Sequence, residues 1–265
     1  MSRIAQAFSK RKVLIPFITA GDPSIKKTEK LIYDMEKAGA DIIELGIPFS
    51  DPLADGPIIQ AAHLRALKNN VSLKDVFALV LKVRKQTSIP LVFMLSDNLI
   101  EKYGTKKFYD DCLRFGVDGV IVPDLPPEEQ GKMLKIRPCL PAGREKEKAK
   151  IDEIFLVAPT SSDERIKMIA EASSGFIYLI SATGITGKRA KLSDQAQGIV
   201  SRIRKYTKKP IAVGFGISNP AQAAEAVRYA DGVIVGSAIV ELIAKKQYIK
   251  AAKFVSSLRK AIDAR

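Results

Sequence analysis

The sequence contains few of the side chains that bind metals or form disulfides. It has one histidine, His63, and two cysteines, Cys112 and Cys139, among 265 residues. The two cysteines have no spacing typical of a metal site or of a disulfide framework. Histidine, aspartate and glutamate also form no cluster with metal-ligand spacing. We therefore expect no metal site, and so little cysteine fits a reducing compartment.

Long apolar runs and stacking aromatic residues are also missing. No segment approaches the ~20 apolar residues of a membrane-spanning helix, and the N-terminus lacks the apolar core of a signal peptide. We expect a soluble, cytoplasmic protein that does not bind membranes. Aromatic residues make up only 7%, and the excess of 43 basic over 29 acidic residues (net charge +14) is spread over nearly every expected helix. Since nucleic-acid surfaces combine basic and aromatic residues, we interpret the charge as a solvated, lysine-rich exterior and expect no nucleic-acid partner.

The hydrophobic pattern predicts a repeating α/β architecture. Eight short, almost continuously apolar segments alternate with segments of helical periodicity. Continuous apolar strands are buried on both faces, as in a parallel sheet covered by helices, and eight such repeats in roughly 250 residues are typical of a (β/α)8 TIM barrel. An open, doubly wound sheet is the alternative, but its glycine fingerprint does not follow the first strand. The strands are expected at 13–19, 41–46, 89–94, 117–124, 154–159, 175–180, 210–216 and 230–237.

We predict a single barrel domain over residues 1–265, with a short N-terminal helix. Ser24 and Ser72 are expected to cap helices, and Pro57 stands at the start of another, where its missing N–H costs nothing. Residues 136–150 form a longer excursion than the repeat needs, and we assign it no function. Residues 181–194 are expected to form a long polar loop after the sixth strand.

Two carboxylates are placed where such barrels perform chemistry, at the carboxyl ends of the strands. Glu44 lies inside the apolar second strand and Asp55 in the loop beyond it. A buried carboxylate costs several kcal/mol unless it is paired, protonated or used, and apolar surroundings suit it to proton transfer near neutrality. We predict that this pair is catalytic. The alternatives are an ion pair for Glu44 and a turn-forming role for Asp55 and Asp51. We expect His63 to face solvent or a neighbouring helix rather than a substrate.

Glycines follow three consecutive strands and suggest an anion site. Backbone N–H groups in these loops and at a helix N-terminus can bind a phosphate, which barrels commonly place after the seventh and eighth strands. The alternative is that these glycines only end their strands. The residues by themselves favour a phosphate-ester enzyme that uses carboxylate acid–base catalysis without a metal. The predicted phosphate-binding residues are Gly187, Gly214, Gly216, Gly236 and Ser237.

At this point seven motifs, in order along essentially the whole chain, resemble the tryptophan synthase alpha chain family. The 44–57 stretch, Glu-Leu-Gly-Ile-Pro-Phe-Ser-Asp-Pro-Leu-Ala-Asp-Gly-Pro, is the most specific of them. The other six lie at 16–23, 122–126, 155–160, 183–187, 213–218 and 235–240.

The resemblance implies a lyase of tryptophan biosynthesis that cleaves indole-3-glycerol phosphate to indole and glyceraldehyde 3-phosphate by retro-aldol chemistry. Glu44 would protonate indole C3 and handle the glycerol hydroxyl proton, and Asp55 would hold the indole N–H as positive charge develops on the ring. Phe17 and Tyr178 would line the indole pocket. Thr186, in a mobile loop, would close over the substrate and hydrogen-bond Asp55.

The resemblance also implies a partner. A beta chain would hold pyridoxal phosphate and receive indole through a tunnel, in an alpha2-beta2 heterotetramer, whereas this chain would bind no such cofactor. One position departs from the family, since Ser96 stands where a tyrosine usually precedes Asn98, with Asp97 beside it. We expect a looser pocket wall and an added charge near the indole. A stand-alone lyase that releases indole, or a weakly active barrel serving as an allosteric partner, are the alternatives.

Overall fold

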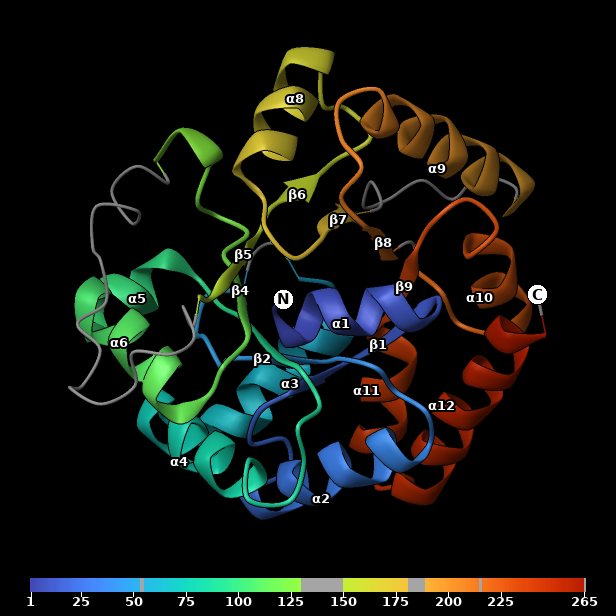
Figure 1. The fold of residues 1–265 in the computed structure, drawn as a ribbon. Helices are drawn as coiled ribbons and strands as arrows, with labels where there is room; N and C mark the ends of the chain where they lie inside the picture. Colours follow the sequence, from blue (N-terminus) through green and yellow to red (C-terminus); the bar gives the residue numbers. More distant parts are fainter. Residues whose placement is uncertain (53–54, 130–149, 181–188, 215, 265) are drawn as a thin grey trace.

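In the computed structural model, residues 1–52, 55–129, 150–180, 189–214 and 216–264 are described, without the side chains of 189–194. Figure 1 shows helices arranged around a central ring of strands. In this part of the chain the sheet has nine parallel strand segments, in the order β5-β4-β3-β2-β1-β9-β8-β7-β6. They are β1 (Val13–Thr19), β2 (Ile43–Gly46), β3 (Leu91–Met94), β4 (Gly119–Ile121), β5 (Asp152–Ile154), β6 (Leu156–Val157), β7 (Ile177–Ile180), β8 (Ile211–Gly214) and β9 (Gly232–Val235).

The sheet closes on itself at Phe155. This residue alone separates β5, which pairs with β4, from β6, which pairs with β7. Its carbonyl accepts a hydrogen bond from the Tyr178 N–H at 3.1 Å. The two segments are thus halves of one fifth strand, and every strand has two neighbours. The predicted eight-stranded TIM barrel is confirmed, and the open-sheet alternative is wrong because no edge remains.

Local sequence signals place most of the helices. Ser24 caps its helix by accepting from the Lys27 N–H, Ser72 and Asp75 form a reciprocal capping box, and Pro57 occupies a first-turn position, as predicted. The helices are α1 (Arg3–Lys10), α2 (Ile25–Lys37), α3 (Pro57–Lys68), α4 (Leu73–Val83), α5 (Asp97–Tyr103), α6 (Thr105–Phe115), α8 (Asp163–Ala172), α9 (Arg189–Arg204), α10 (Pro220–Ala226), α11 (Ser237–Ala244) and α12 (Tyr248–Asp263), with a 3-10 turn at Pro127–Glu129.

Several boundaries differ from the prediction: most strands are shorter than expected, such as Gly119–Ile121 within the predicted 117–124, and one helix begins earlier. Helix α9 begins at Arg189, within the stretch 181–194 that we expected to be a loop. Alanine, lysine and leucine at its start are strong helix formers, and their propensity outweighs the polar composition. Cys112 is buried in α6, as expected. Cys139 and the 136–150 excursion, up to residue 149, lie outside the described residues.

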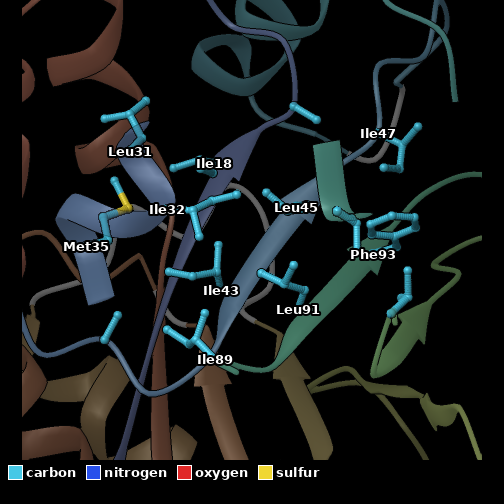
Figure 2. Packing of buried hydrophobic residues seen from close by; sticks show 14 of the residues in the cluster. Ile18, Leu31, Ile32, Met35, Ile43, Leu45, Ile47, Ile89, Leu91 and Phe93 are labelled. Atoms are coloured by element: carbon cyan, nitrogen blue, oxygen red, sulfur yellow. The ribbon is translucent and has the colours of Figure 1, made fainter. Parts of the chain in front are cut away.

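Alternate residues of the strands serve two different cores. Ile42 belongs to the cluster inside the barrel, whereas Ile43 and Leu45 belong to the cluster between the strands and the helices. Figure 2 shows this outer cluster, in which Ile43 and Leu45 lie beside Ile32 of α2. Successive side chains of a strand point to opposite faces. Glu44 lies between Ile43 and Leu45, which point outward, so its side chain points into the barrel.

Helix α1 covers one end of the barrel. In Figure 1 it lies across the centre of the ring. Ile4 is fully buried in the inner cluster, and the ring of Phe8 lies 5.5 Å from that of Phe176. The ring of Phe8 also contacts the start of β9, where a Cβ on Gly232 would lie 3.2 Å from it. The end at which the strands begin is therefore occupied, so a substrate site belongs at the opposite end.

A buried carboxylate joins the elements near this covered end. Asp118, just before β4, is 7% exposed and accepts hydrogen bonds from Arg84 at 2.6 Å, from Arg3 at 2.8 Å and from the Leu91 N–H at 2.8 Å. Hydrogen bonds between charged groups are stronger than neutral ones. Asp118 thus links α1, α4 and the β3–β4 pair.

We predict that Asp118→Ala destabilises the protein by about 3–5 kcal/mol, because it leaves the Arg84 guanidinium, whose side chain is 11% exposed, without its carboxylate. Urea unfolding followed by circular dichroism measures this change. Glu241→Ala is the control, since its ion pair with Lys245 is about half exposed on both sides, and it is expected to cost less than about 1 kcal/mol. Equal losses in the two variants would contradict the prediction.

Candidate active site

Glu44 is a buried acid without a hydrogen-bond partner. It lies on β2 between Phe17 of β1 and Val92 of β3, and it is 1% exposed. Neither of its carboxyl oxygens has a hydrogen-bond partner among the described residues, so the predicted alternative of an ion pair finds no support there. Burial raises the pKa of Glu44 to about 8, and the nearby charge of Asp55 contributes to the shift. At neutral pH the carboxyl group is therefore mostly protonated and can donate a proton.

Asp55 and Tyr178 share this environment. Asp55 lies in the loop between β2 and α3, and Tyr178 lies on β7, on the other side of the ring. Burial raises the pKa of Tyr178 well above its ordinary value, and the charges of Glu44 and Asp55 act in the same direction. The charge of Asp55 thus acts on both Glu44 and Tyr178, so the two predicted catalytic carboxylates lie close enough to influence each other's ionisation.

The loop that carries Asp55 is held by its own following helix, α3. Nε2 of His63 lies 3.2 Å from Oδ2 of Asp55, and Nδ1 of His63 accepts a hydrogen bond from the Phe49 N–H at 3.2 Å. Gln60, one turn earlier on α3, donates from Nε2 to the Asp55 carbonyl at 2.8 Å. Side chain and backbone of Asp55 are thus both anchored to α3.

The expectation that His63 faces solvent is wrong, whereas its orientation relative to a substrate stays a prediction. Its side chain is 5% exposed and contacts a catalytic candidate. The signal was present, because Ala62, His63 and Ala66 share one face of α3 at helical spacing, and all three are buried. The hydrophobic pattern alone does not say that this face meets the Asp55 loop.

Two glycines make room for the predicted aromatic residues of the pocket. A Cβ on Gly46 would lie 2.5 Å from the ring of Phe17, which is 4% exposed at the end of β1. A Cβ on Gly214 would lie 2.9 Å from the hydroxyl oxygen of Tyr178. Any larger residue at either position would push the aromatic ring away. Gly214, which we predicted as a phosphate ligand, therefore also accommodates Tyr178.

The described phosphate-binding candidates lie at the carboxyl ends of two neighbouring strands, with Gly214 as the last residue of β8. Strands β8 and β9 pair in parallel, so the loops after them are adjacent. Gly216 is exposed with a left-handed φ of 57°, Gly236 is the N-cap residue of α11, and Ser237 is its exposed first residue. The first N–H groups of a helix have no acceptor within it and suit an anion. Thr186 and Gly187 lie outside the described residues.

Two further residues at this end have surroundings that the sequence did not indicate. Thr19 ends β1, is 2% exposed, and its hydroxyl has no hydrogen-bond partner among the described residues. Ser96 donates a hydrogen bond to Asp124, and the N–H of Asp97 donates to the same carboxylate at 3.0 Å. Ser96 therefore joins the loops that follow β3 and β4. That its presence loosens the pocket wall stays a prediction.

The arrangement suits proton transfer to a bound anion. A protonated acid lies inside the barrel, a second carboxylate lies in the loop after the same strand, and amide donors lie after two neighbouring strands. Within the described ranges, no group of three or more His, Cys, Asp and Glu residues could hold a metal ion. Every described helix is also too short or too polar to cross a bilayer.

Comparison with known proteins gives a consistent picture. The family model of the tryptophan synthase alpha chain matches residues 4–263. The tryptophan synthase alpha chain of Lacticaseibacillus casei is 47% identical, over 100% of this chain and 97% of the relative, and that of Geotalea daltonii is 45% identical over 100% of both. A solved structure of tryptophan synthase subunit alpha from Legionella pneumophila matches with a TM-score of 0.87 and 36% identity over 100% of both chains. A chain of Mycobacterium tuberculosis tryptophan synthase matches with a TM-score of 0.87 and 34% identity over 98% of both.

We predict that stability falls with rising pH because of Glu44. Below pH 4.5 the group is protonated in both states, but between pH 4.5 and about 8 only the unfolded state loses the proton, so stability declines until the folded pKa is passed. Glu44→Gln removes this decline, because glutamine has the shape of the protonated acid and does not ionise. We expect the variant to be more stable than the wild type by on the order of 2–4 kcal/mol at pH 7.

Urea unfolding at pH 5, 7 and 8.5 measures this difference. The stability gap between Glu44→Gln and wild type should widen as the pH rises. Asp51→Asn, at an exposed position in the same loop, serves as the control and should show no such widening. A gap for Glu44→Gln that is constant across this range would mean that Glu44 ionises normally.

Proposed function

Because the chain belongs to the tryptophan synthase alpha chain family, we propose that it cleaves indole-3-glycerol phosphate to indole and glyceraldehyde 3-phosphate at the Glu44–Asp55 site. It would thus act as a carbon–carbon lyase. The single observation that carries this assignment is Glu44, a buried acid inside the barrel with a raised pKa and no hydrogen-bond partner among the described residues. A structural carboxylate would be paired, whereas this one is available to a substrate.

Glu44 is proposed to supply and recover one proton. Its protonated carboxyl donates to C3 of the indole ring, which makes the bond from C3 to the glycerol chain breakable. When this bond breaks, its electron pair returns to the ring and restores the aromatic indole. The hydroxyl on the departing carbon loses its proton to the Glu44 carboxylate and becomes the aldehyde carbonyl. Donor and acceptor are the same group, so the acid is regenerated.

Asp55 is proposed to stabilise the charge that the first step creates. Protonation at C3 leaves positive charge on the indole nitrogen, and a carboxylate that accepts the N–H hydrogen bond favours this state over the neutral substrate. A fixed charge in a site shielded from water acts strongly because it needs no rearrangement during the reaction. The anchoring of Asp55 by His63 and Gln60 supports this role.

The remaining predicted residues fit the two ends of the substrate. Phe17 and Tyr178 are proposed to line the indole ring, since both are buried at the same mouth. The phosphate is proposed to bind at the N–H groups around Gly216, Gly236 and Ser237. Thr186 and Gly187 lie outside the described residues. Their proposed roles, closure over the substrate for Thr186 and phosphate binding for Gly187, rest on the sequence and the family resemblance.

An alpha chain of tryptophan synthase has a beta chain as its partner. We propose an alpha2-beta2 heterotetramer in the cytoplasm, with pyridoxal phosphate held by the beta chain and no cofactor in this chain. The similarity to proteins named as tryptophan synthase alpha chains supports this partner.

We predict that Glu44→Gln lowers kcat for cleavage by at least about 10³-fold, since it removes the general acid and base. Asp55→Asn should lower it by roughly 10²–10³-fold, as expected when a group that stabilises charge is lost. Coupled detection of glyceraldehyde 3-phosphate measures both. Asp51→Asn, exposed in the same loop, should leave the isolated chain close to wild type. Near-normal turnover by a folded Glu44→Gln variant would remove Glu44 from this role.

We also predict that a beta chain from a relative raises the cleavage rate, on the order of tenfold, which is typical of coupling between sites. Steady-state rates with and without a saturating beta chain measure this. An equal rate in both cases would instead identify a stand-alone, indole-releasing lyase. Cleavage that stays negligible in both, while the beta-chain reaction is stimulated, would identify a weakly active allosteric partner.

A further inference from the structure

The hydrogen bonds of His63 determine where its proton lies. It is the only histidine of the chain, and its side chain is 5% exposed. Nδ1 faces the Phe49 N–H at 3.2 Å, and an amide N–H can only donate, so Nδ1 must be the unprotonated acceptor. The proton then belongs on Nε2, which lies 3.2 Å from the Asp55 carboxylate. The geometry thus sets one neutral tautomer, with its Nε2–H within hydrogen-bonding distance of the Asp55 carboxylate.

We propose that His63 is a positioning residue for the reaction: it donates its Nε2–H to Oδ2 of Asp55 and so directs the other oxygen, Oδ1, at the indole N–H. Only the last part of this statement, the substrate group that Oδ1 meets, rests on the proposed function. The tautomer and the 3.2 Å contact that motivates the hydrogen bond follow from the geometry alone.

The need for such a residue follows from where Asp55 lies. Its side chain is 26% exposed and projects from a loop rather than from a strand. Gln60 fixes the backbone of this residue but leaves the carboxylate free to rotate. His63 supplies the missing restraint, and it is itself held at Nδ1 by the Phe49 N–H, at the other end of the loop. One ring thereby fixes the carboxylate relative to the end of β2, the strand that carries Glu44.

This restraint is expected to act on the rate more than on substrate binding. The positive charge on the indole nitrogen is present in the transition state and absent from the bound substrate, so a misdirected Asp55 loses an interaction made mainly in the transition state. A displacement of about 1 Å can cost on the order of 10²-fold in rate. Removal of the His63 donor is therefore expected to lower kcat, with a smaller change in KM.

The tautomer is tested first, without reference to catalysis. Because the chain has one histidine, ¹⁵N-histidine labelling gives a single pair of ring-nitrogen signals that need no assignment between residues. We expect Nε2 protonated and Nδ1 unprotonated in the wild type, with the pattern lost or averaged in Asp55→Ala. A protonated Nδ1, or fast exchange between tautomers in the wild type, would overturn the proposal.

Two variants then separate the two hydrogen bonds. In His63→Asn the side-chain oxygen takes the place of Nδ1 and can still accept from Phe49, but the shorter side chain cannot reach Asp55. In His63→Gln the amide nitrogen lies near the place of Nε2 and can still donate to Asp55. We expect kcat to fall by roughly 10–100-fold in His63→Asn, with KM changed much less, and to recover largely in His63→Gln. Normal kcat in His63→Asn with a loss in His63→Gln would show that the ring only holds the Phe49 segment.

A double-mutant cycle closes the test. If His63 acts through Asp55, adding His63→Asn to Asp55→Asn should leave the residual rate unchanged. Independent, multiplying losses would overturn the proposal. If the wild type does not cleave indole-3-glycerol phosphate at all, the proposed function fails, whereas the ¹⁵N measurement still decides whether His63 holds Asp55.

Discussion

The proposed chemistry depends on one costly placement inside a barrel of apolar side chains, an acid with no counter-charge among the residues that the structure describes. Burial disfavours the ionised form, so Glu44 keeps its proton to a pH at which an exposed glutamate has long lost it. Asp55, itself charged, adds to this effect rather than relieving it. The same burial that makes the group expensive in the folded state makes it reactive. In this sense part of the folding free energy is given up to obtain a proton donor.

The rest of the fold serves to keep that placement intact. Alternation along β2 directs Glu44 inward, while Ile43 and Leu45 pack outward against helices. A shift of one residue in register would turn the Glu44 side chain outward, into the layer between the strands and the helices. Helix α1 occupies the opposite end and leaves a single mouth. At that mouth α3 carries Gln60 and His63, which hold the second carboxylate. The strands position the acid, and one helix positions its companion.

Local patterns predicted most of this architecture. The strands are apolar throughout because both faces are buried, and serine caps and a first-turn proline act within one turn of a helix, so both can be recognised in the chain alone. The start of α9 at Arg189 differs from the predicted loop, because the helix propensity of its first residues outweighs their polar composition. The burial of Glu44 was predictable from its apolar neighbours.

What the sequence could not provide is the identity of tertiary neighbours. His63 lies on a buried helical face that periodicity reveals, yet only the folded chain shows that this face meets Asp55 and Phe49. Likewise, the sequence shows only that Ser96 stands where the family usually has a tyrosine. In the fold, its hydroxyl also donates a hydrogen bond to Asp124 on the next loop. Both contacts join segments that no local rule relates.

The two glycines beneath Phe17 and Tyr178 have a consequence for how this family can diversify. Each ring occupies the space where a β-carbon would stand on the neighbouring strand. A methyl group at Gly46 or Gly214 is therefore tolerable only if the facing ring becomes smaller. Across descendants of this chain, such positions should change in compensating pairs, large with small, so the breadth of the proposed indole site evolves in coupled steps rather than one residue at a time.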